Sequence, residues 1–339
     1  RLSWCIEFAD YAAFYAALDQ HREHVRRCFR ELLSPEGEVE PAPGQRSNLE
    51  AATAAWRGTE TDDATFAALG FDDPAAARGV LEQLHTPTFL DRLSREGRER
   101  LDRMMPLLIE ATASRHHAPA TFARLAELVR AIARRSVYLS LLTDHPQTLA
   151  RLIDLFHASP WIARQITTHP LLLDELLDTR VLYAPPAPAA LIEQLGVLLA
   201  GHDPDDLEAL MDALRQFKNQ QVLRVAASDV MEHFPIAEVS NQPSYIAQAL
   251  LHHALAMATS ILDNKHGMPT CVVDGERRRV GYAIIAYGKL GGLELGYGSD
   301  LDLVFLHDSA GEKQVTEGER SVDNNVYFTR LTQRIIHFL

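Results

Sequence analysis

The stretch YGKLGGLELGYGSDLDLVFLHD, Tyr287 to Asp308, decides the fold of the second part of this 339-residue chain. It contains five glycines, then two aspartates separated by one leucine, then an apolar run. Because side chains on a strand alternate between its faces, Asp300 and Asp302 are predicted to point the same way, with Leu301 and Leu303 on the opposite face. Two carboxylates on one face repel each other and are costly to desolvate, so the pattern favours a bound divalent cation.

Magnesium suits such a pair, since it prefers hard oxygen ligands and takes the rest of its coordination shell from water and phosphate. The glycines before the aspartates let the backbone approach a phosphate chain and present N–H donors to it. The stretch is not a Walker A loop, because Lys289 is followed by Leu290 where Ser or Thr is needed, nor does it match the GxGxxG dinucleotide motif. The combination of glycines and same-face aspartates favours nucleotidyl transfer.

Short β-prone segments precede this stretch. Residues 270–273 and 280–287 favour extended structure, and the Asp274-Gly275 pair between them is typical of a tight turn, so the two segments are predicted to form a hairpin. Residues 300–307 are the predicted third strand. Arg277–Arg279 follow the turn and are interpreted as solvated turn residues, with a phosphate clamp as the alternative.

Helices are predicted on both sides of the strands. Before residue 264, helix-favouring residues are frequent and apolar residues recur at helical spacing, which indicates a mostly α-helical structure of helical bundles. After the strands, a helix is predicted to begin near Asp323. Two sets of apolar residues have the helical spacing: Leu149, Leu152, Ile153 and Phe156, and Phe328, Leu331, Ile335 and Phe338. Helix starts are predicted where a capping residue precedes proline, at Asp73-Pro74, His145-Pro146, Ser159-Pro160 and His169-Pro170.

The composition limits the classes of partner. The chain has 33 Lys and Arg against 46 Asp and Glu, a net charge of −13, which disfavours nonspecific binding to nucleic acid or to an anionic membrane. It contains no unbroken run of about 18 apolar residues and does not begin like a signal peptide, so a cytoplasmic protein is expected.

The cysteines and histidines do not predict a metal site. Cys5, Cys28 and Cys271 are widely separated and lack a CxxC pair, so they are interpreted as small buried residues. The histidine pairs lack the i, i+4 spacing and the third ligand that zinc needs, and are interpreted as surface or core residues. These pairs are His21 and His24, His116 and His117, and His252 and His253.

The glycines and aspartates together resemble the motif of the DNA-polymerase-beta-like nucleotidyltransferase superfamily. That motif is a hydrophobic residue, Gly, then Gly or Ser, a gap, and Asp-hydrophobic-Asp. Tyr287-Gly288-Lys289, the gap 290–299 and Asp300-Leu301-Asp302 reproduce this order. Lys289 departs from the motif, although a lysine could still reach a phosphate as a point charge. The resemblance implies an α/β nucleotidyltransferase domain.

A longer match identifies a narrower family. AYGKLGGLELGYGSDLDLVFLHD, residues 286–308, resembles the transferase half of the glutamine synthetase adenylyltransferase family. The removing half of that family more often has Asn-hydrophobic-Ser-Ser-Asp where this chain has Gly296-Tyr297-Gly298-Ser299-Asp300. The adenylylating half is therefore favoured, with the removing half as the alternative. The segments 69–84, 157–178 and 214–230 resemble the connecting region of the family.

The resemblance implies transfer of AMP from ATP to a tyrosine of glutamine synthetase, with Mg²⁺ held by the catalytic residues Asp300 and Asp302. Lys218 and Arg224 could approach the nucleotide, but a charged helix face is the favoured interpretation. A PII-type nitrogen sensor is the implied regulatory partner, and a helical scaffold without activity of its own is a further alternative. The nucleotide would contact Gly288, Lys289, Gly298 and Ser299, with a turn role as the alternative for Ser299.

The superfamily uses a third carboxylate, which this family places in a VDxRLRP-like segment that the chain does not contain. On an extended strand Asp308 would point to the same face as Asp302, but it would lie about 20 Å further along, too far to share a metal. The chain alone is therefore expected to be weakly active or inactive.

The predicted organisation follows from these resemblances and from two proline-rich connections, residues 34–48 and 184–189. Residues 1–33 are expected as the helical tail of a preceding domain, 34–48 as a linker, 49–183 as a helical linker domain, 184–263 as helices leading into the catalytic domain, and 264–339 as the N-terminal part of an incomplete α/β nucleotidyltransferase domain.

Overall fold

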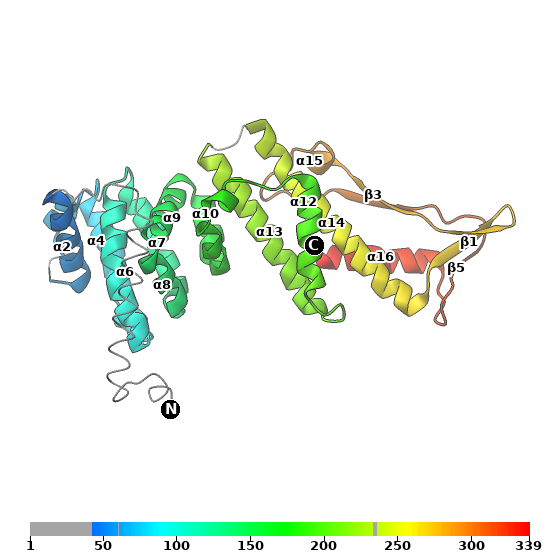
Figure 1. Cartoon of the computed structure of the whole chain (residues 1–339), viewed down its shortest axis with the longest axis horizontal. Helices are drawn as coiled ribbons and strands as arrows, with labels where there is room; N and C mark the ends of the chain where they lie inside the picture. The colour runs from blue at the N-terminus through cyan, green and yellow to red at the C-terminus, as the bar shows by residue number, and fades with distance from the viewer. Residues whose placement is uncertain (1–42, 60, 233–235) are drawn as a thin grey trace, which may run out of the picture. The chain divides into compact units, whose positions relative to one another are not determined.

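The computed structural model describes residues 43–59, 61–232 and 236–339 (Figure 1). The chain divides into two compact units, residues 1–51 and 52–339, and the description below concerns the second. Predictions on residues 1–33, including Cys5, Cys28, His21 and His24, lie outside the described residues.

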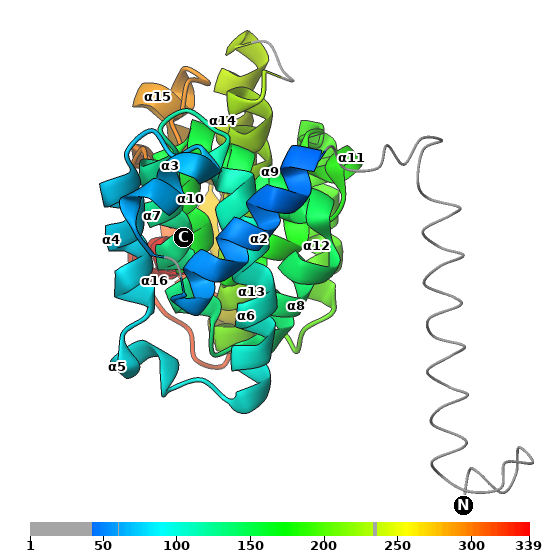
Figure 2. The ribbon, with the colours of Figure 1, turned by 90° about the vertical axis from the view of Figure 1, so that its left-hand side faces the viewer.

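Short helices form the first part of the second unit (Figure 2). Their buried faces include Trp56, Phe66, Phe122 and Phe156, each at most 2% exposed. Apolar residues at helical spacing therefore form a core between the helices. The helix α2 (Pro43–Arg57) begins in the first unit and ends in the second. The helices that follow are α3 (Asp63–Leu69), α4 (Pro74–Leu84), α5 (Pro87–Leu90), α6 (Arg95–Ala113), α7 (Ala118–Ile132), α8 (Ser136–Asp144), α9 (Pro146–Ala158), α10 (Pro160–Thr168), the 3₁₀ helix η2 (Pro170–Leu176) and α11 (Thr179–Leu182).

The predicted helix starts are mostly confirmed. The Asp73 side chain accepts a hydrogen bond from the Ala76 N–H, and Ser159 caps α10 in the same way. His145-Pro146 begins α9, whose four predicted core residues are all buried. His169-Pro170 begins a 3₁₀ helix instead of an α-helix, with i to i+3 bonds such as Leu172 N–H to His169 O. In addition, α2 begins at Pro43, inside the stretch 34–48 that the sequence predicts as a linker.

Three long helices, a pair of small sheets and a final helix share a second core. Its buried members include Leu195 on one helix, Phe217 on the next, Leu262 on the third, and Cys271 and Ile335 further on. The helices that lead into the predicted catalytic segment therefore pack against that segment. The elements are α12 (Pro188–Ala200), α13 (Leu207–Val230), α14 (Ile236–His266), β1 (Pro269–Val273), β2 (Glu276–Arg279), β3 (Tyr282–Ala286), α15 (Gly288–Gly291), β4 (Leu303–His307), β5 (Glu312–Thr316) and α16 (Asn324–Phe338).

The helix α14 is the central element of this core. By length and composition alone, its residues Val239–His266 could span a membrane. In the structure, its buried residues Ala249, Ala254, Ala258 and Leu262 belong to the core shared with α12, α13 and α16. Burial against these neighbours explains its apolar composition.

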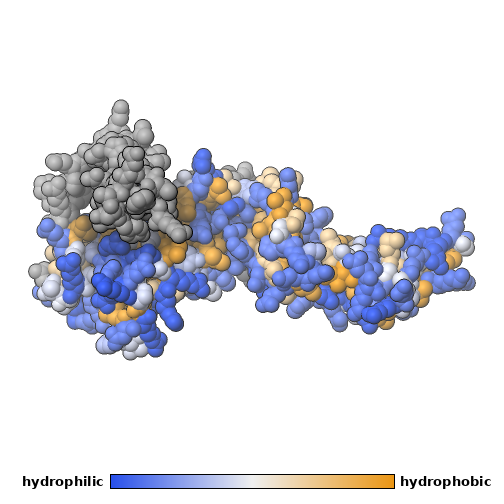
Figure 3. All heavy atoms as spheres, turned by 60° about the horizontal axis from the view of Figure 1, so that its bottom comes forward, coloured by the Kyte–Doolittle hydropathy of each residue, from blue (hydrophilic) through white to orange (hydrophobic). Residues whose placement is uncertain are grey.

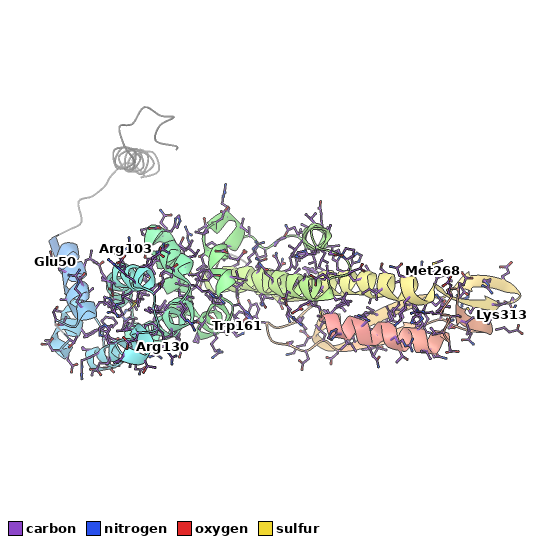
Figure 4. The ribbon with its side chains drawn as sticks, turned by 90° about the horizontal axis from the view of Figure 1, so that it is seen from below. Glu50, Arg103, Arg130, Trp161, Met268 and Lys313 are labelled. Carbon is purple, nitrogen blue, oxygen red and sulfur yellow. The ribbon has the colours of Figure 1, made fainter. Side chains whose placement is uncertain are left out.

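The strands form two antiparallel sheets, in the order β2-β1-β5 and β3-β4. The turn is at Asp274-Gly275 as predicted, and both residues have a positive φ, 53° and 83°. The predicted partner is wrong, because Val273 pairs with Glu276 and β1 thus forms its hairpin with Glu276–Arg279. A two-residue turn places the residues directly after it in the ladder, whatever their β-propensity. Residues 282–286 pair instead with β4. Figure 4 labels Met268, which directly precedes β1, and Lys313 in β5.

The last helix is confirmed. The Asp323 side chain caps α16 by accepting from the Asn325 N–H. All four predicted core residues of this helix are buried. The coloured part of the face seen in Figure 3 is mostly hydrophilic, with hydrophobic side chains in separate patches, as expected of a folded protein surface.

One tyrosine of α16 provides a stability prediction. The Tyr327 hydroxyl, on a side chain that is 1% exposed, donates to Asp263 Oδ1 at 2.6 Å. Burial raises the pKa of Tyr327, and the hydrogen bond to Asp263 raises it further, so the phenol stays protonated. Tyr327→Phe is expected to lower the free energy of unfolding by about 2 kcal/mol, since it deprives a carboxylate of a donor.

Urea denaturation measures this loss. The matched control is Tyr282→Phe, whose hydroxyl bonds the neutral Thr332 hydroxyl at 2.7 Å and whose loss is expected to be about 1 kcal/mol or less. Equal losses for the two variants would contradict the role given to the charge of Asp263.

Candidate functional site

The two aspartates are placed by the β3-β4 ladder. Ala286 pairs with Leu303, and the next bond runs from the Tyr287 N–H to the Asp302 carbonyl oxygen at 2.9 Å. The strand predicted over residues 300–307 begins only at Leu303, so Asp302 directly precedes it and Asp300 lies two residues earlier. Asp300 and Asp302 are exposed, whereas Leu301 and Leu303 pack on the core. The predicted alternation of faces is thus confirmed.

Both carboxylates are open to a ligand. Among residues 43–59, 61–232 and 236–339, neither Asp300 nor Asp302 has a side-chain hydrogen bond or an ion pair. In the same ranges, no group of three or more His, Cys, Asp or Glu is arranged to hold a metal ion. The pair fits a hard divalent cation of the magnesium type, which accepts a few carboxylate oxygens and completes its shell with water and phosphate.

Gly288 lies directly against Asp302. Its φ is +54°, a left-handed conformation that other residues adopt at a cost. A Cβ atom at this position would collide with Asp302 Oδ2 and lie 3.4 Å from Asp302 Cγ. The structure therefore brings together two residues that are separated by the whole glycine-rich loop, and the close approach requires glycine.

The other predicted nucleotide ligands line the same loop. Lys289 is exposed on α15, and Gly298 is exposed with no atom within 4 Å of a Cβ built on it. Ser299 closes a turn, because its Oγ accepts from the Gly296 N–H at 3.1 Å and its N–H donates to the Gly296 oxygen at 3.2 Å. The turn role of Ser299 is thus present, and the phosphate contacts stay predictions.

Tyr297, in the middle of the loop, is a residue of the site that the sequence did not predict. Its hydroxyl donates to Asp229 Oδ2 at 2.9 Å, and its ring stacks on Trp161 with centroids 5.1 Å apart. Burial raises the pKa of Tyr297 well above its ordinary value, and the bond to Asp229 adds to the shift. The signal available in the sequence was an aromatic residue between two glycines, where no core position is expected.

The three arginines with a phosphate clamp as their alternative interpretation, Arg277–Arg279, lie near acidic residues of other elements. Arg278 pairs with Asp308 at 2.6 Å and holds the pKa of that carboxyl below its ordinary value. Arg277 pairs with Glu317, and Arg279 lies 3.5 Å from Asp263. Arg277–Arg279 are therefore strand residues in ion pairs, which corrects the interpretation as turn residues and leaves the phosphate clamp without support.

Two charged residues of α13, Lys218 and Arg224, have neighbours other than the predicted nucleotide ligands. Arg224 pairs with Glu175 at 2.8 Å. Lys218 lines a cavity of about 630 Å³ between α13 and η2, together with His169 and Arg215. No predicted nucleotide ligand lines this cavity. Of the histidine pairs, His253 packs through its Nε2, which lies 2.8 Å from the Ile192 carbonyl oxygen.

Comparison with known proteins gives the family. Residues 149–339, more than half of the chain, match the sequence model of glutamate-ammonia ligase adenylyltransferase. Proteins named bifunctional glutamine synthetase adenylyltransferase/adenylyl-removing enzyme are similar over the whole chain. That of Thioalkalivibrio sulfidiphilus is 45% identical, with 36% of its length covered, and those of Nitrosococcus oceani and Hahella chejuensis are 39% and 40% identical, each with 35% covered. The chain spans about a third of the length of these relatives. It belongs to the glutamate-ammonia ligase adenylyltransferase family.

Proposed function

We propose that this chain contains the nucleotide- and metal-binding face of an adenylyltransferase that moves AMP from ATP to a tyrosine of glutamine synthetase. The observation that supports it best is the exposure of both Asp300 and Asp302, with Gly288 directly against Asp302. The names of the relatives supply the reaction and the acceptor. The proposal includes an α/β nucleotidyltransferase fold, of which the β3-β4 sheet would be a part.

Asp300 and Asp302 would hold Mg²⁺, which when bound would neutralise charge on the phosphates and on the attacking oxygen. The absence of a side chain at Gly288 leaves room for the Asp302 carboxylate, which occupies the space where a Cβ would lie. Lys289, exposed on α15, would contact a phosphate oxygen as a point charge.

The covalent step would be an exchange at the α-phosphorus of ATP. The tyrosine oxygen forms a bond to that phosphorus, the bond to the bridging oxygen breaks, and pyrophosphate leaves. The hydroxyl proton passes to solvent. The open position of the two carboxylates fits an acceptor that is a side chain on the surface of another protein.

The test uses the complete gene product, unmodified glutamine synthetase and ATP labelled at either the α- or the γ-phosphate. Label from the α position is expected on glutamine synthetase after denaturing electrophoresis, and label from the γ position is not. Absence of α-label, with release of ADP from adenylylated glutamine synthetase upon addition of phosphate, would assign the chain to the removing reaction instead, because the phosphate takes the place of the tyrosine oxygen on the AMP phosphorus.

A third outcome would favour the scaffold alternative. If neither reaction occurs while residues 49–183 capture glutamine synthetase or a PII-type sensor, the chain acts by binding alone. Regulation by a PII-type sensor and a cytoplasmic location belong to the proposal, the latter because the reaction draws on cytoplasmic ATP.

Gly288→Ala tests the tight contact in the proposed site. The left-handed φ costs a residue with a Cβ about 1 kcal/mol, and the collision displaces Asp302. The variant is expected to unfold at a lower urea concentration and to bind MgATP about tenfold more weakly, which isothermal titration calorimetry measures.

Gly298→Ala is the control for stability, because no atom lies within 4 Å of its added Cβ. It is expected to unfold like the parent chain. An unchanged affinity of Gly288→Ala for MgATP would show that Gly288 is not part of the nucleotide-binding site.

A further inference from the structure

The loop that leads into the two aspartates is anchored to helices far away in the sequence. The Leu295 N–H donates to Ser244 Oγ on α14 at 3.3 Å, and Ser244 is fully buried. Two residues later, the Tyr297 hydroxyl bonds Asp229 on α13. Asp300 follows after three more residues, so the backbone that carries it is fixed from one side by these contacts.

The ring of Tyr297 has a second partner on a different helix. Trp161, labelled in Figure 4, is on α10, and the planes of the two rings are inclined by 29°. Both side chains are half-buried at this contact. Stacking of this kind contributes beyond the area that it buries, and it restricts the ring to one orientation.

Asp229 stands in an electrostatically unfavourable place. It lies in the last turn of α13, which ends at Val230, where the helix dipole disfavours negative charge. The half-buried carboxylate has no ion pair with any residue in the part of the chain that the structure describes. Among the residues that the structure describes, the Tyr297 hydroxyl donates a hydrogen bond to this carboxylate. A carboxylate in this position is therefore better explained by its bond to the loop than by the stability of the helix.

The same helix is fixed to the block of short helices. Five residues before Asp229, Arg224 forms an ion pair with Glu175 of η2, with side chains 15% and 10% exposed. η2 in turn packs against α10, which contains Trp161. Both partners of Tyr297 thus belong to one packed set of helices.

We propose that Tyr297, held between Trp161 and Asp229, is a positioning residue for adenylyl transfer, which sets the loop 295–302 so that Asp300 and Asp302 face the nucleotide; this inference rests on the proposed function. Through it, the arrangement of α10, η2 and α13 determines the geometry of the carboxylates. The side chain of Tyr297 thereby links the positions of these helices to the positions of the Asp300 and Asp302 carboxylates.

The test compares variants of the complete gene product that differ in one hydrogen bond. Tyr297→Phe and Asp229→Ala are each expected to lower kcat for AMP transfer about tenfold, with KM for ATP changed by less than about threefold. Asp229→Asn keeps an oxygen that accepts from the Tyr297 hydroxyl, and is expected to retain kcat within about threefold. The double variant Tyr297→Phe/Asp229→Ala is expected to lose no more than either single variant, because both remove the same bond.

Tyr282→Phe is the matched control, since it removes a half-buried tyrosine hydroxyl whose bond to Thr332 lies outside the loop. It is expected to leave kcat unchanged. Full kcat in both Tyr297→Phe and Asp229→Ala would overturn the proposal, as would an equal loss in Asp229→Asn and Asp229→Ala.

A second measurement does not depend on the reaction. In this chain, amide hydrogen exchange of residues 293–302 is expected to be faster in Tyr297→Phe and Asp229→Ala than in the parent, with exchange in residues 207–223 unchanged. Faster exchange throughout the protein would indicate general destabilisation and overturn the positioning role. If the parent enzyme transfers no AMP at all, the proposed function fails, while the exchange result still decides whether the bond orders the loop.

Discussion

Replacing both Asp300 and Asp302 by asparagine is expected to lower AMP transfer by the complete gene product about 10³-fold or more. The substitution removes two negative charges at nearly constant shape, and the cation and phosphates that they would hold supply several kcal/mol of transition-state stabilisation. The fold is expected to persist, because both side chains are exposed and form no hydrogen bond or ion pair within the described part of the chain. Initial rates with labelled ATP, together with circular dichroism, measure both effects.

Asp308→Asn is the control for charge alone. Asp308 is a nearby exposed carboxylate on the same segment, but it pairs with Arg278 and accepts from the Gly281 N–H. Its removal is expected to leave the rate of transfer within about threefold, since it makes no contact with the proposed site. A double aspartate variant with a rate within tenfold of the parent would show that the reaction takes place elsewhere.

Arg224→Ala is expected to have the largest effect on stability, a loss of about 3 kcal/mol in the free energy of unfolding. Arg224 and Glu175 are mostly buried, with side chains 15% and 10% exposed. The guanidinium donates from Nε to Glu175 Oε2 at 2.8 Å, and its Nη2 lies 2.8 Å from the same oxygen. The substitution leaves Glu175 as a buried charge without a partner. Guanidinium chloride denaturation measures the loss.

The control for this prediction removes both charges. Arg224→Met/Glu175→Met is expected to recover most of the lost stability, because a well-packed apolar pair avoids the desolvation penalty. Arg95→Ala, which breaks an ion pair whose side chains are 93% and 60% exposed, is expected to have no measurable effect. Equal losses in Arg224→Ala and the double methionine variant would show that packing, not charge, is responsible.

Local features of the fold were predictable because they depend on neighbouring residues. Ser159-Pro160 predicted the start of α10, and the spacing of Phe328, Leu331, Ile335 and Phe338 predicted the buried face of α16. The alternation of aspartate and leucine over residues 300–303 predicted that Asp300 and Asp302 are exposed while Leu301 and Leu303 pack on the core, because side chains alternate along extended backbone.

Strand pairing was predictable only in part, because it depends on partners far apart in the sequence. Glu276–Arg279 has a charged composition that propensity does not assign to a strand, yet the two-residue turn at Asp274-Gly275 forces it to pair with β1. The arginines are accommodated there by Asp308, Glu317 and Asp263, which come from other elements.

The candidate site, like the strand pairing, was predictable only in part. The sequence predicted Asp300, Asp302 and the glycine-rich loop. It could not predict that Gly288 touches the Asp302 carboxylate, nor that Tyr297 reaches Asp229 and Trp161, since these contacts exist only after the helices and the loop have packed.

The most direct test of the proposed metal site is Mn²⁺ binding, measured by electron paramagnetic resonance on this chain with an ATP analogue that cannot transfer AMP. The expected result is that nucleotide and Mn²⁺ together give an immobilised Mn²⁺ signal in the parent chain and none in Asp300→Asn/Asp302→Asn at the same concentrations. An equal immobilised signal in both chains would contradict the assignment of Asp300 and Asp302 as the metal ligands.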